Sequence, residues 1–588
     1  MCPPAQSCSV MDGSASCANS SPRTLRCHRN HRYSRYRYRT HACEEDRIMN
    51  IGQALTASVS GLTANTITVQ AFITPGLPTF TMVGAKDTVL LQARERVRAA
   101  CKTTGLSWPK TRITVNLSPA SLPKYGASYD LAVAACLCSA MRCVNPFALD
   151  DTLVLGELAL DGSVLPITSV LPIVSHALAT GIQRIILPEA NVPEARILSD
   201  DSLSILGVKH IQDLLRILGA SSNTIGLPVS SSPSVTTQPT QNEAEQRYSS
   251  LTDGSYQFLD TASRDFTDVI GHEDAKWALE IAAAGGHHVL MQGPPGVGKT
   301  MLASRLPSIL PDLTHEEAIE AACIRSSLGL PVTSPLDVTA PFLNVHHNVT
   351  LASFTGGIQG ATIKPGAMTL AHHGILFLDE APEFERNVMQ ALRTPLETGF
   401  VTVTRLRGAV SYPAQFQLIL AQNPCPCGHL WSTHGECTCT AQELRRYRQR
   451  ISGPIRDRID IKLDVPPVHS LATPAASSDT YSPLLGTHAH WDSEHMRETV
   501  RLARERSAYR YQNLPWSTNA HADASWLMRQ TPRSLLTAVN ALLKREEITV
   551  RGAHKILRIA WSISDLLGKG HPDADDLSAA QALYLPGN

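Results

Sequence analysis

The sequence predicts an α/β chain with a helical C-terminal part, and three observations lead to this fold class. Short β-rich runs alternate with helical patterns from 49 to 219, and the same alternation returns from 255 to 466. From 491 to 588 apolar residues recur at helical spacing instead. Alternating strands and helices favour parallel sheets covered by helices, so we expect two α/β domains followed by a helical one.

Polar segments separate these parts. Residues 220–254 are rich in Ser, Thr, Pro and Gln and lack a hydrophobic period, which is typical of a linker, and residues 467–490 form a second low-order stretch. Residues 1–48 are rich in Arg, Tyr and His without periodicity. We interpret them either as a disordered basic arm or as a start-site artefact, because Met49 begins the first ordered pattern.

Composition narrows the class of protein. The 588 residues include 52 Lys and Arg against 52 Asp and Glu, which excludes nucleic-acid binding through overall positive charge. Hydrophobic residues make up 43%, enough for a sizeable core. No stretch provides the ~20 apolar residues of a membrane span, and the first residues carry no apolar signal segment. We therefore expect a cytoplasmic protein without a membrane partner.

A phosphate-binding loop is predicted where the apolar run HHVLMQ is followed by GPPGVGKT and a helical pattern. Glycines in this motif let backbone N–H groups surround phosphate oxygens. Its Lys contacts the outer phosphates of ATP, and its Thr ligates Mg²⁺. The residues expected to bind ATP and Mg²⁺ here are Gly293, Pro294, Pro295, Gly296, Val297, Gly298, Lys299 and Thr300.

Two further strands supply polar residues for the same site. The run GILFL ends in Asp379 and Glu380. We expect Asp379 to hold the Mg²⁺ together with Thr300, and Glu380 to orient or deprotonate the attacking water. The run FQLILA leads to Asn423, which is expected to sense the terminal phosphate. The alternative for Asn423 is a turn residue before Pro424.

Four cysteines form the pattern C-x-C…C-x-C. Four thiolates bind Zn²⁺ tetrahedrally, although one residue within each pair is tighter than the usual two to four. His429 and His434 are nearby substitutes. A zinc site and a metal-free thiol-rich loop both remain open. The candidate ligands are Cys425, Cys427, Cys437 and Cys439.

Several long segments carry a family resemblance. They are GPPGVGKTMLASRLPSILP, KPGAMTLAHHGILFLDEAPEF, ALRTPLETGFVTVTR, NPCPCG and SGPIRDRIDI, with ITVRGAHKILRIAWSISDLLG near the C-terminus. Together they resemble the magnesium-chelatase-like AAA+ ATPases and, more narrowly, the YifB/ComM competence-protein family, over nearly the whole chain from Met49. The resemblance implies an AAA+ core with a parallel sheet over 255–466, a helical lid over 491–588 and a homo-oligomer, most often a hexamer.

The resemblance also assigns roles to arginines. Arg458 in SGPIRDRID is similar to the arginine finger, which reaches the ATP of the neighbouring subunit. Arg456 is its rival, and an ordinary salt bridge is the alternative. Arg551 in TVRGAHKIL resembles sensor 2, a contact from the lid to the γ-phosphate of the same subunit, with Arg558 as the second choice.

Residues 49–219 resemble the proteolytic domain of Lon, a ribosomal-protein-S5-like α/β fold. Ser128 falls near the position of the nucleophilic Ser in Lon. However, the stretch 168–173, where Lon has its Lys, contains no Lys or Arg. A Ser hydroxyl without a base is a poor nucleophile. We therefore expect an inactive relative that serves assembly or DNA contact.

Basic residues in two hairpin-like segments are the candidate DNA contacts. The stretch 400–410 resembles the pre-sensor-1 hairpin and places Arg405 and Arg407 near its tip. The stretch 355–371 resembles the helix-2 insert and contains Lys364. Such tips would grip phosphates inside a ring, although ordinary solvated charge is the alternative. The basic run 443–450 would serve DNA or a subunit interface.

These expectations combine into one leading hypothesis. The chain would be an ATP-hydrolysing motor with helicase activity that promotes branch migration in homologous recombination and the integration of transforming DNA. Its partners would be branched or single-stranded DNA and further copies of itself, and its cofactors ATP, Mg²⁺ and, at the cysteine quartet, Zn²⁺. The alternatives are a metal-insertion ATPase subunit like that of magnesium chelatase and a nucleotide-dependent scaffold.

Overall fold

The computed structural model describes residues 50–84, 87–122, 124, 127–220, 255–259, 264–359, 362–405, 408–431, 436–467 and 491–585. The N-terminal segment 1–48 lies outside these residues, as do the predicted linkers 220–254 and 467–490 apart from a few terminal positions. Among the helices that are described, none combines the length and the apolar character needed to cross a membrane.

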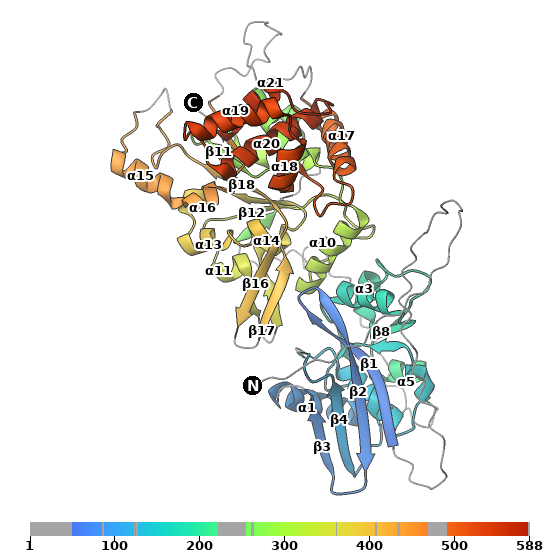
Figure 1. Cartoon of the computed structure of the whole chain (residues 1–588). Helices are drawn as coiled ribbons and strands as arrows, with labels where there is room; N and C mark the ends of the chain where they lie inside the picture. Colours follow the sequence, from blue (N-terminus) through green and yellow to red (C-terminus); the bar gives the residue numbers. More distant parts are fainter. Residues whose placement is uncertain are drawn as a thin grey trace, which may run out of the picture. The chain divides into compact units, whose positions relative to one another are not determined.

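A mixed sheet organises residues 50–220, with strand order β3-β4-β2-β1-β5-β8-β9 (Figure 1). β2 runs antiparallel to β1 and β4, and the other neighbours are parallel. Alternate residues of β4 are buried, as expected for a strand with one face on a core. The strands are β1 Asn50–Ser60, β2 Thr63–Thr74, β3 Thr79–Val83, β4 Arg112–Ser118, β5 Thr152–Val154, β8 Arg184–Pro188 and β9 Ser204–Val208, with the small pair β6 Glu157–Leu158 and β7 Val164–Leu165.

The helix α2 packs against β1 and β2, and all of its residues are buried. Its close approach to β1 depends on Gly52, where an added Cβ would lie 2.1 Å from the carbonyl oxygen of Cys136. The helices are α1 Asp87–Thr103, α2 Asp130–Ala140, α3 Val170–Thr180, α4 Val192–Ala195 and α5 Ile211–Ile217. The α/β architecture that the sequence predicted for this part is confirmed.

A second sheet has the strand order β10-β12-β15-β18-β11-β19, in which β10 is antiparallel to β12 and the other neighbours are parallel. All residues of β15 and β18 are buried, because helices cover both faces of the sheet. The carboxyl ends of β11, β15 and β18 meet at one edge. The strands are β10 Tyr256–Phe258, β11 Val289–Gln292, β12 Phe342–Val345, β15 Ile375–Leu378, β18 Gln417–Gln422 and β19 Ile461–Asp464.

Helices and two hairpins surround this sheet. The helix α10 begins with a reciprocal cap between Thr314 and Glu317. The hairpins are β13 Gly356–Gln359 with β14 Thr362–Pro365, and β16 Phe400–Arg405 with β17 Gly408–Pro413. The helices are α7 Glu273–Gly285, α8 Lys299–Ala303, α9 Leu306–Ile309, α10 His315–Leu328, α11 Leu351–Thr355, α12 Ala367–Leu370, α13 Arg386–Ala391, α14 Pro395–Thr398, α15 Ala441–Arg450 and α16 Gly453–Arg456.

The C-terminal part is helical, as predicted, and Figure 1 shows its helices grouped beside β11 and β18. Its long helix α20 packs on α7 and α17. Buried side chains of α20, including Trp561, join the same apolar core as those of β11 and β19. The helices are α17 Ser493–Arg510, α18 Ala524–Gln530, α19 Arg533–Lys544, α20 Val550–Leu566 and α21 Ala574–Tyr584.

Candidate active site

The glycine-rich loop connects β11 to α8 at the carboxyl edge of the second sheet. Gly293 must be glycine, since an added Cβ would lie 2.4 Å from the carbonyl oxygen of Val465. Gly296 has φ +78° and an added Cβ would meet nothing within 4 Å, so the loop is open on that side. Gly298 precedes the helix with φ +92°. The loop therefore has the positive-φ turns and the open concave face of a phosphate cradle.

Lys299 is buried at the base of this loop. Its Nζ donates hydrogen bonds to the carbonyl oxygens of Gly293 (2.8 Å) and Pro294 (2.9 Å). A third bond, of 3.1 Å, goes to Oδ1 of Asn423. Burial lowers the pKa of Lys299, against the opposite effect of Asp379 and Glu380. The ammonium is thus held where neutral oxygens contact it and a phosphate would stabilise its charge.

The two carboxylates after β15 differ in their surroundings. Thr300 Oγ1 donates to Asp379 Oδ2 at 2.7 Å, which brings together the two residues predicted to ligate Mg²⁺. Glu380 has a left-handed backbone (φ +50°) and its N–H donates to Asp379 Oδ1. Its own carboxylate is exposed and lies 3.7 Å from His347 Nδ1. His347 is a neighbour of the site that sequence reasoning missed, because it lies outside every motif.

Asn423 follows β18, and its contact with Lys299 places it in the same cluster as the loop. The strands β18 and β11 are parallel neighbours, and Gly293 N–H donates to the carbonyl of Gln422. A side-chain bond of 2.6 Å between Gln422 and Gln292 closes the two strand ends. The structure thus joins Lys299 to Asn423 and Thr300 to Asp379 by side-chain hydrogen bonds, at the ends of three neighbouring strands.

The arginines predicted from the family resemblance are differently engaged. Arg458 is paired with Glu397 and also donates to the carbonyl of Pro454. Arg456 Nη2 donates to the carbonyl of Arg448 at 2.6 Å. In α20, Arg558 donates twice to the carbonyl of Ala522, at 3.0 and 2.6 Å.

Arg551 is exposed in the first turn of α20, in contrast to Arg558 in the same helix. The guanidinium of Arg558 is used by a backbone carbonyl, whereas Arg551 is exposed. Its contact with nucleotide stays a prediction.

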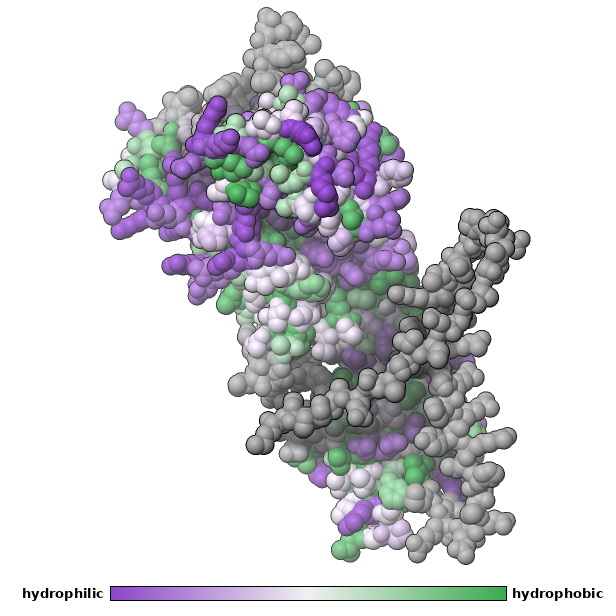
Figure 2. Space-filling model, viewed as in Figure 1, coloured by the Kyte–Doolittle hydropathy of each residue, from purple (hydrophilic) through white to green (hydrophobic). Residues whose placement is uncertain are grey.

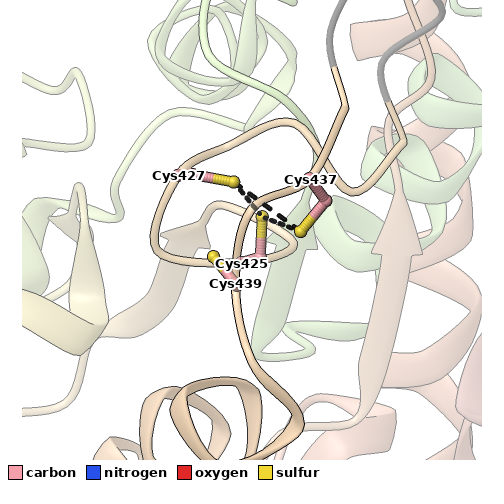
Figure 3. A group of neighbouring side chains, drawn as sticks. All are labelled: Cys425, Cys427, Cys437 and Cys439. Carbon is pink, nitrogen blue, oxygen red and sulfur yellow. Dashed lines mark hydrogen bonds between the residues drawn. The ribbon is translucent and has the colours of Figure 1, made fainter.

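The four cysteines lie close together in the loop between β18 and α15 (Figure 3). Their Sγ atoms all fall within 4.8 Å of one another. Three of the pairs measure 3.3, 3.7 and 3.8 Å. The backbone N–H of His429 lowers the pKa of Cys427 to about 6, which favours the thiolate. With Zn–S bonds of about 2.3 Å, a tetrahedral site requires sulfur separations of about 3.8 Å, so the quartet fits Zn²⁺.

The cysteine loop also contacts the phosphate loop. Gly428 has φ +81°, and an added Cβ would lie 2.7 Å from two ring carbons of Pro295. Of the histidine substitutes, His429 is exposed and His434 lies outside the described residues.

The three candidate DNA contacts have different outcomes. Lys364 Nζ donates to the carbonyl of Ser327 at 2.5 Å and is half-buried, so its charge is used inside the chain. The hairpin β16–β17 has the predicted form, but the side chain of Arg405 and the whole of Arg407 lie outside the described residues. Helix α15 carries four exposed arginines, Arg445, Arg446, Arg448 and Arg450, of which Arg450 is paired with Glu383. Hydrophilic residues predominate over the region of this helix in Figure 2.

A second cluster of possible metal ligands is satisfied by hydrogen bonds. Glu320 Oε2 contacts Nε2 of His372 (3.0 Å) and Nε2 of His373 (2.8 Å). Nδ1 of His372 accepts the backbone N–H of Gln415, so its Nε2 carries the proton that faces Glu320. Both nitrogens of His372 are thereby used, and this cluster fits no metal in that form.

Comparisons with known proteins agree with the architecture. Three family models match, described as magnesium chelatase subunit ChlI (265–472), subunit ChlI of Mg-chelatase (69–191) and magnesium chelatase subunit ChlI C-terminal (490–583). The uncharacterized protein YifB of Escherichia coli is 35% identical over 520 residues, covering 88% of this chain and 94% of YifB.

Two further relatives extend this result. Competence protein ComM of Haemophilus influenzae is 33% identical over 525 residues, covering 89% of this chain and 95% of ComM. Lon protease of Roseiflexus castenholzii is 29% identical over 171 residues, a partial match that covers 27% of this chain and 21% of Lon. The long alignments to YifB and ComM determine the assignment. The chain belongs to the YifB/ComM family of magnesium-chelatase-like AAA+ ATPases.

Proposed function

We propose that this protein hydrolyses ATP to move branched DNA, and so promotes branch migration in homologous recombination and the integration of transforming DNA. The observation that carries ATP hydrolysis is the convergence of Lys299, Thr300, Asp379 and Asn423 at one sheet edge. The DNA task is supported by the relative ComM of Haemophilus influenzae, which is named a competence protein. Helicase activity and a cytoplasmic location belong to the same proposal.

Different residues of the chain have different roles in the proposed phosphoryl transfer. Bound ATP supplies the phosphoryl group, and Thr300 and Asp379 would hold Mg²⁺, which would supply positive charge to the phosphates. Lys299 exchanges its contacts with loop carbonyls for phosphate oxygens. Asn423, already bonded to Lys299, reports the presence of the terminal phosphate. Glu380 stands at an exposed position where it orients or deprotonates the attacking water.

Arg458 completes the site in our proposal from a neighbouring subunit, which requires a ring and favours a hexamer. Within one chain Arg458 is paired with Glu397. On ring assembly, Arg458 would have to release Glu397 and contact a phosphate of the ATP in the neighbouring subunit. An Arg in this position stabilises the charge that spreads over the transferred phosphoryl group.

DNA would be held by arginines rather than by the overall charge, which is balanced. The exposed arginines of α15 and the tip of the β16–β17 hairpin are the candidate surfaces. Phosphate contacts of this kind release counterions and make binding dependent on salt.

We further propose that the cysteine quartet binds Zn²⁺ as a structural, four-ligand site without an open position. The ligands Cys425 and Cys427 follow directly on Asn423 and Pro424, and the loop touches Pro295. Zn²⁺ would therefore brace both the sensor residue and the phosphate loop. Metal analysis of the purified protein should give about one Zn²⁺ per chain, against much less in Cys425→Ser. Equal, near-zero zinc in both would exclude this site.

The decisive experiment compares ATP hydrolysis with and without four-way DNA. We expect branched DNA to stimulate the wild-type rate, and Glu380→Gln to retain nucleotide binding while hydrolysis collapses in both conditions. The ChlI descriptions of the three family models favour metal insertion as a second candidate. Stimulation by a metal-free porphyrin and a protein partner, with no response to DNA, would select that candidate and reject ours.

A further inference from the structure

A buried lysine of the C-terminal helical part, Lys555, contacts the segment that follows Arg458 in the chain. Lys555 lies on α20 and its side chain is 5% exposed. Its Nζ lies 3.1 Å from Oδ1 of Asp460 and donates to the carbonyl oxygen of Ile459 at 2.8 Å. Both acceptors follow Arg458 directly in the chain. The lid helix therefore holds the segment that immediately follows the candidate arginine finger.

The same carboxylate is tied to the strand that leads to the phosphate loop. Oδ2 of Asp460 accepts the backbone N–H of His288 at 3.2 Å and lies 3.5 Å from Nδ1 of His287. Both histidines directly precede β11. The ring of His287 also contacts the lid, because its Nε2 lies 2.8 Å from Oγ of Ser562 in α20. Asp460 is thus the point at which lid, finger segment and β11 meet.

We call the pair Lys555 and Asp460 the joint. Its two opposite charges compensate each other inside the protein. The Asp460 side chain is 7% exposed. Burial alone would raise the pKa of Asp460, but Lys555 and His287 hold it well below its usual range. Burial lowers the pKa of Lys555 in turn, against the effect of Asp460. Replacing a buried ion pair with apolar residues is often neutral for stability, whereas removing one partner leaves an uncompensated charge. The pair therefore fixes an orientation more than it adds stability.

The helix α20 also carries the candidate nucleotide contact. Arg551 lies four residues before Lys555, and residues at this spacing share a helix face. A displacement of α20 that accompanies a contact between Arg551 and nucleotide would be passed by Lys555 to the segment after Arg458. Within one subunit, the bound nucleotide would thereby be linked to Arg458, which acts on the ATP of the neighbouring subunit.

We propose that Lys555 and Asp460 are positioning residues that couple the lid of each subunit to its Arg458, and so to the ATP site of the next subunit. This inference rests on the proposed function, in which Arg458 acts on the neighbouring site. It assigns the pair no contact with nucleotide.

Subunit mixing tests the coupling. Lys555→Met keeps the length of the side chain and removes its charge. Alone, it should lower kcat for ATP by about 10-fold, the size of a typical coupling, with little change in KM. Mixed with Glu380→Gln, it should regain hydrolysis, because the Glu380→Gln subunit cannot hydrolyse but offers a correctly held Arg458. A defect confined to the subunit's own site would not be rescued in this way.

Three controls keep the outcomes separate. Arg458→Ala mixed with Glu380→Gln must show the same rescue, and its failure would reject the finger in the proposed function rather than the joint. If that control is rescued and Lys555→Met is not, the coupling is wrong. If Lys555→Met does not fold, the double variant Lys555→Met/Asp460→Asn, which leaves no buried charge, takes its place with the same expected rescue. Lys555→Arg should keep most of the activity.

Discussion

Two buried lysines in the ATPase part of the chain have contrasting surroundings. The three hydrogen bonds of Lys299 go to neutral oxygens of Gly293, Pro294 and Asn423. Lys555, in contrast, contacts the carboxylate of Asp460. A buried cation bonded to neutral groups gains from an anionic ligand, whereas one that contacts a carboxylate is already compensated. The first arrangement describes a ligand site and the second a structural joint.

The largest effect should come from the ligand-site lysine. We expect Lys299→Ala to abolish nucleotide binding, because it removes the charge that the phosphate loop itself brings to the outer phosphates. Lys555→Met should bind nucleotide with nearly wild-type affinity. Fluorescence titration with a labelled ADP measures both. Equal losses of affinity in the two variants would remove the contrast between the two sites.

The next largest effect concerns Arg458, the candidate arginine finger. Arg458→Ala should lower kcat by about 1,000-fold, the usual contribution of an arginine finger, while nucleotide affinity changes little. Arg456→Ala is the matched control, since Arg456 lies two residues before Arg458 and is its rival for the role of the finger. Steady-state ATPase assays distinguish them. A larger loss of kcat in Arg456→Ala would exchange the roles of the two residues.

A smaller effect distinguishes Arg405, a candidate DNA contact, from Lys364, which is bonded inside the chain. Arg405→Ala should weaken DNA binding and reduce the slope of log K against log salt by about one. Lys364→Ala should leave that slope unchanged, because Lys364 already donates to the carbonyl of Ser327. Binding to a labelled single strand at several salt concentrations gives both slopes. A reduced slope in Lys364→Ala would restore it as a DNA contact.

The smallest effect is a dependence of stability on pH. Burial lowers the pKa of both His288 and His372 to about 4, from about 6.5 in the unfolded chain. The unfolded state therefore binds more protons between these values, and stability falls as the pH drops from about 6.5 towards 4. Thermal unfolding at several pH values should show this decline. A melting temperature that is constant over this range would contradict the burial of neutral histidines.

The sequence predicted the fold class and the place of the phosphate loop between a strand and a helix because both depend on local patterns. Gly293 to Thr300 are contiguous, and the apolar run before Asp379 must be a buried strand. The joint at Asp460 could not be predicted in this way. Its partner Lys555 lies 96 residues from Ile459 and inside a helical pattern where a lysine is ordinarily exposed. His347 was missed for the same reason, and the internal bond of Lys364 depends on a fold that no motif encodes.

Movement of a four-way DNA junction shows directly whether this protein couples ATP hydrolysis to branch migration. The wild-type protein should convert a labelled junction to its separated duplexes with ATP, and should fail to do so with a non-hydrolysable ATP analogue. Glu380→Gln with ATP should fail as well. Conversion at equal rates with and without hydrolysable ATP, or no conversion by a protein that hydrolyses ATP in the presence of the junction, would contradict the account.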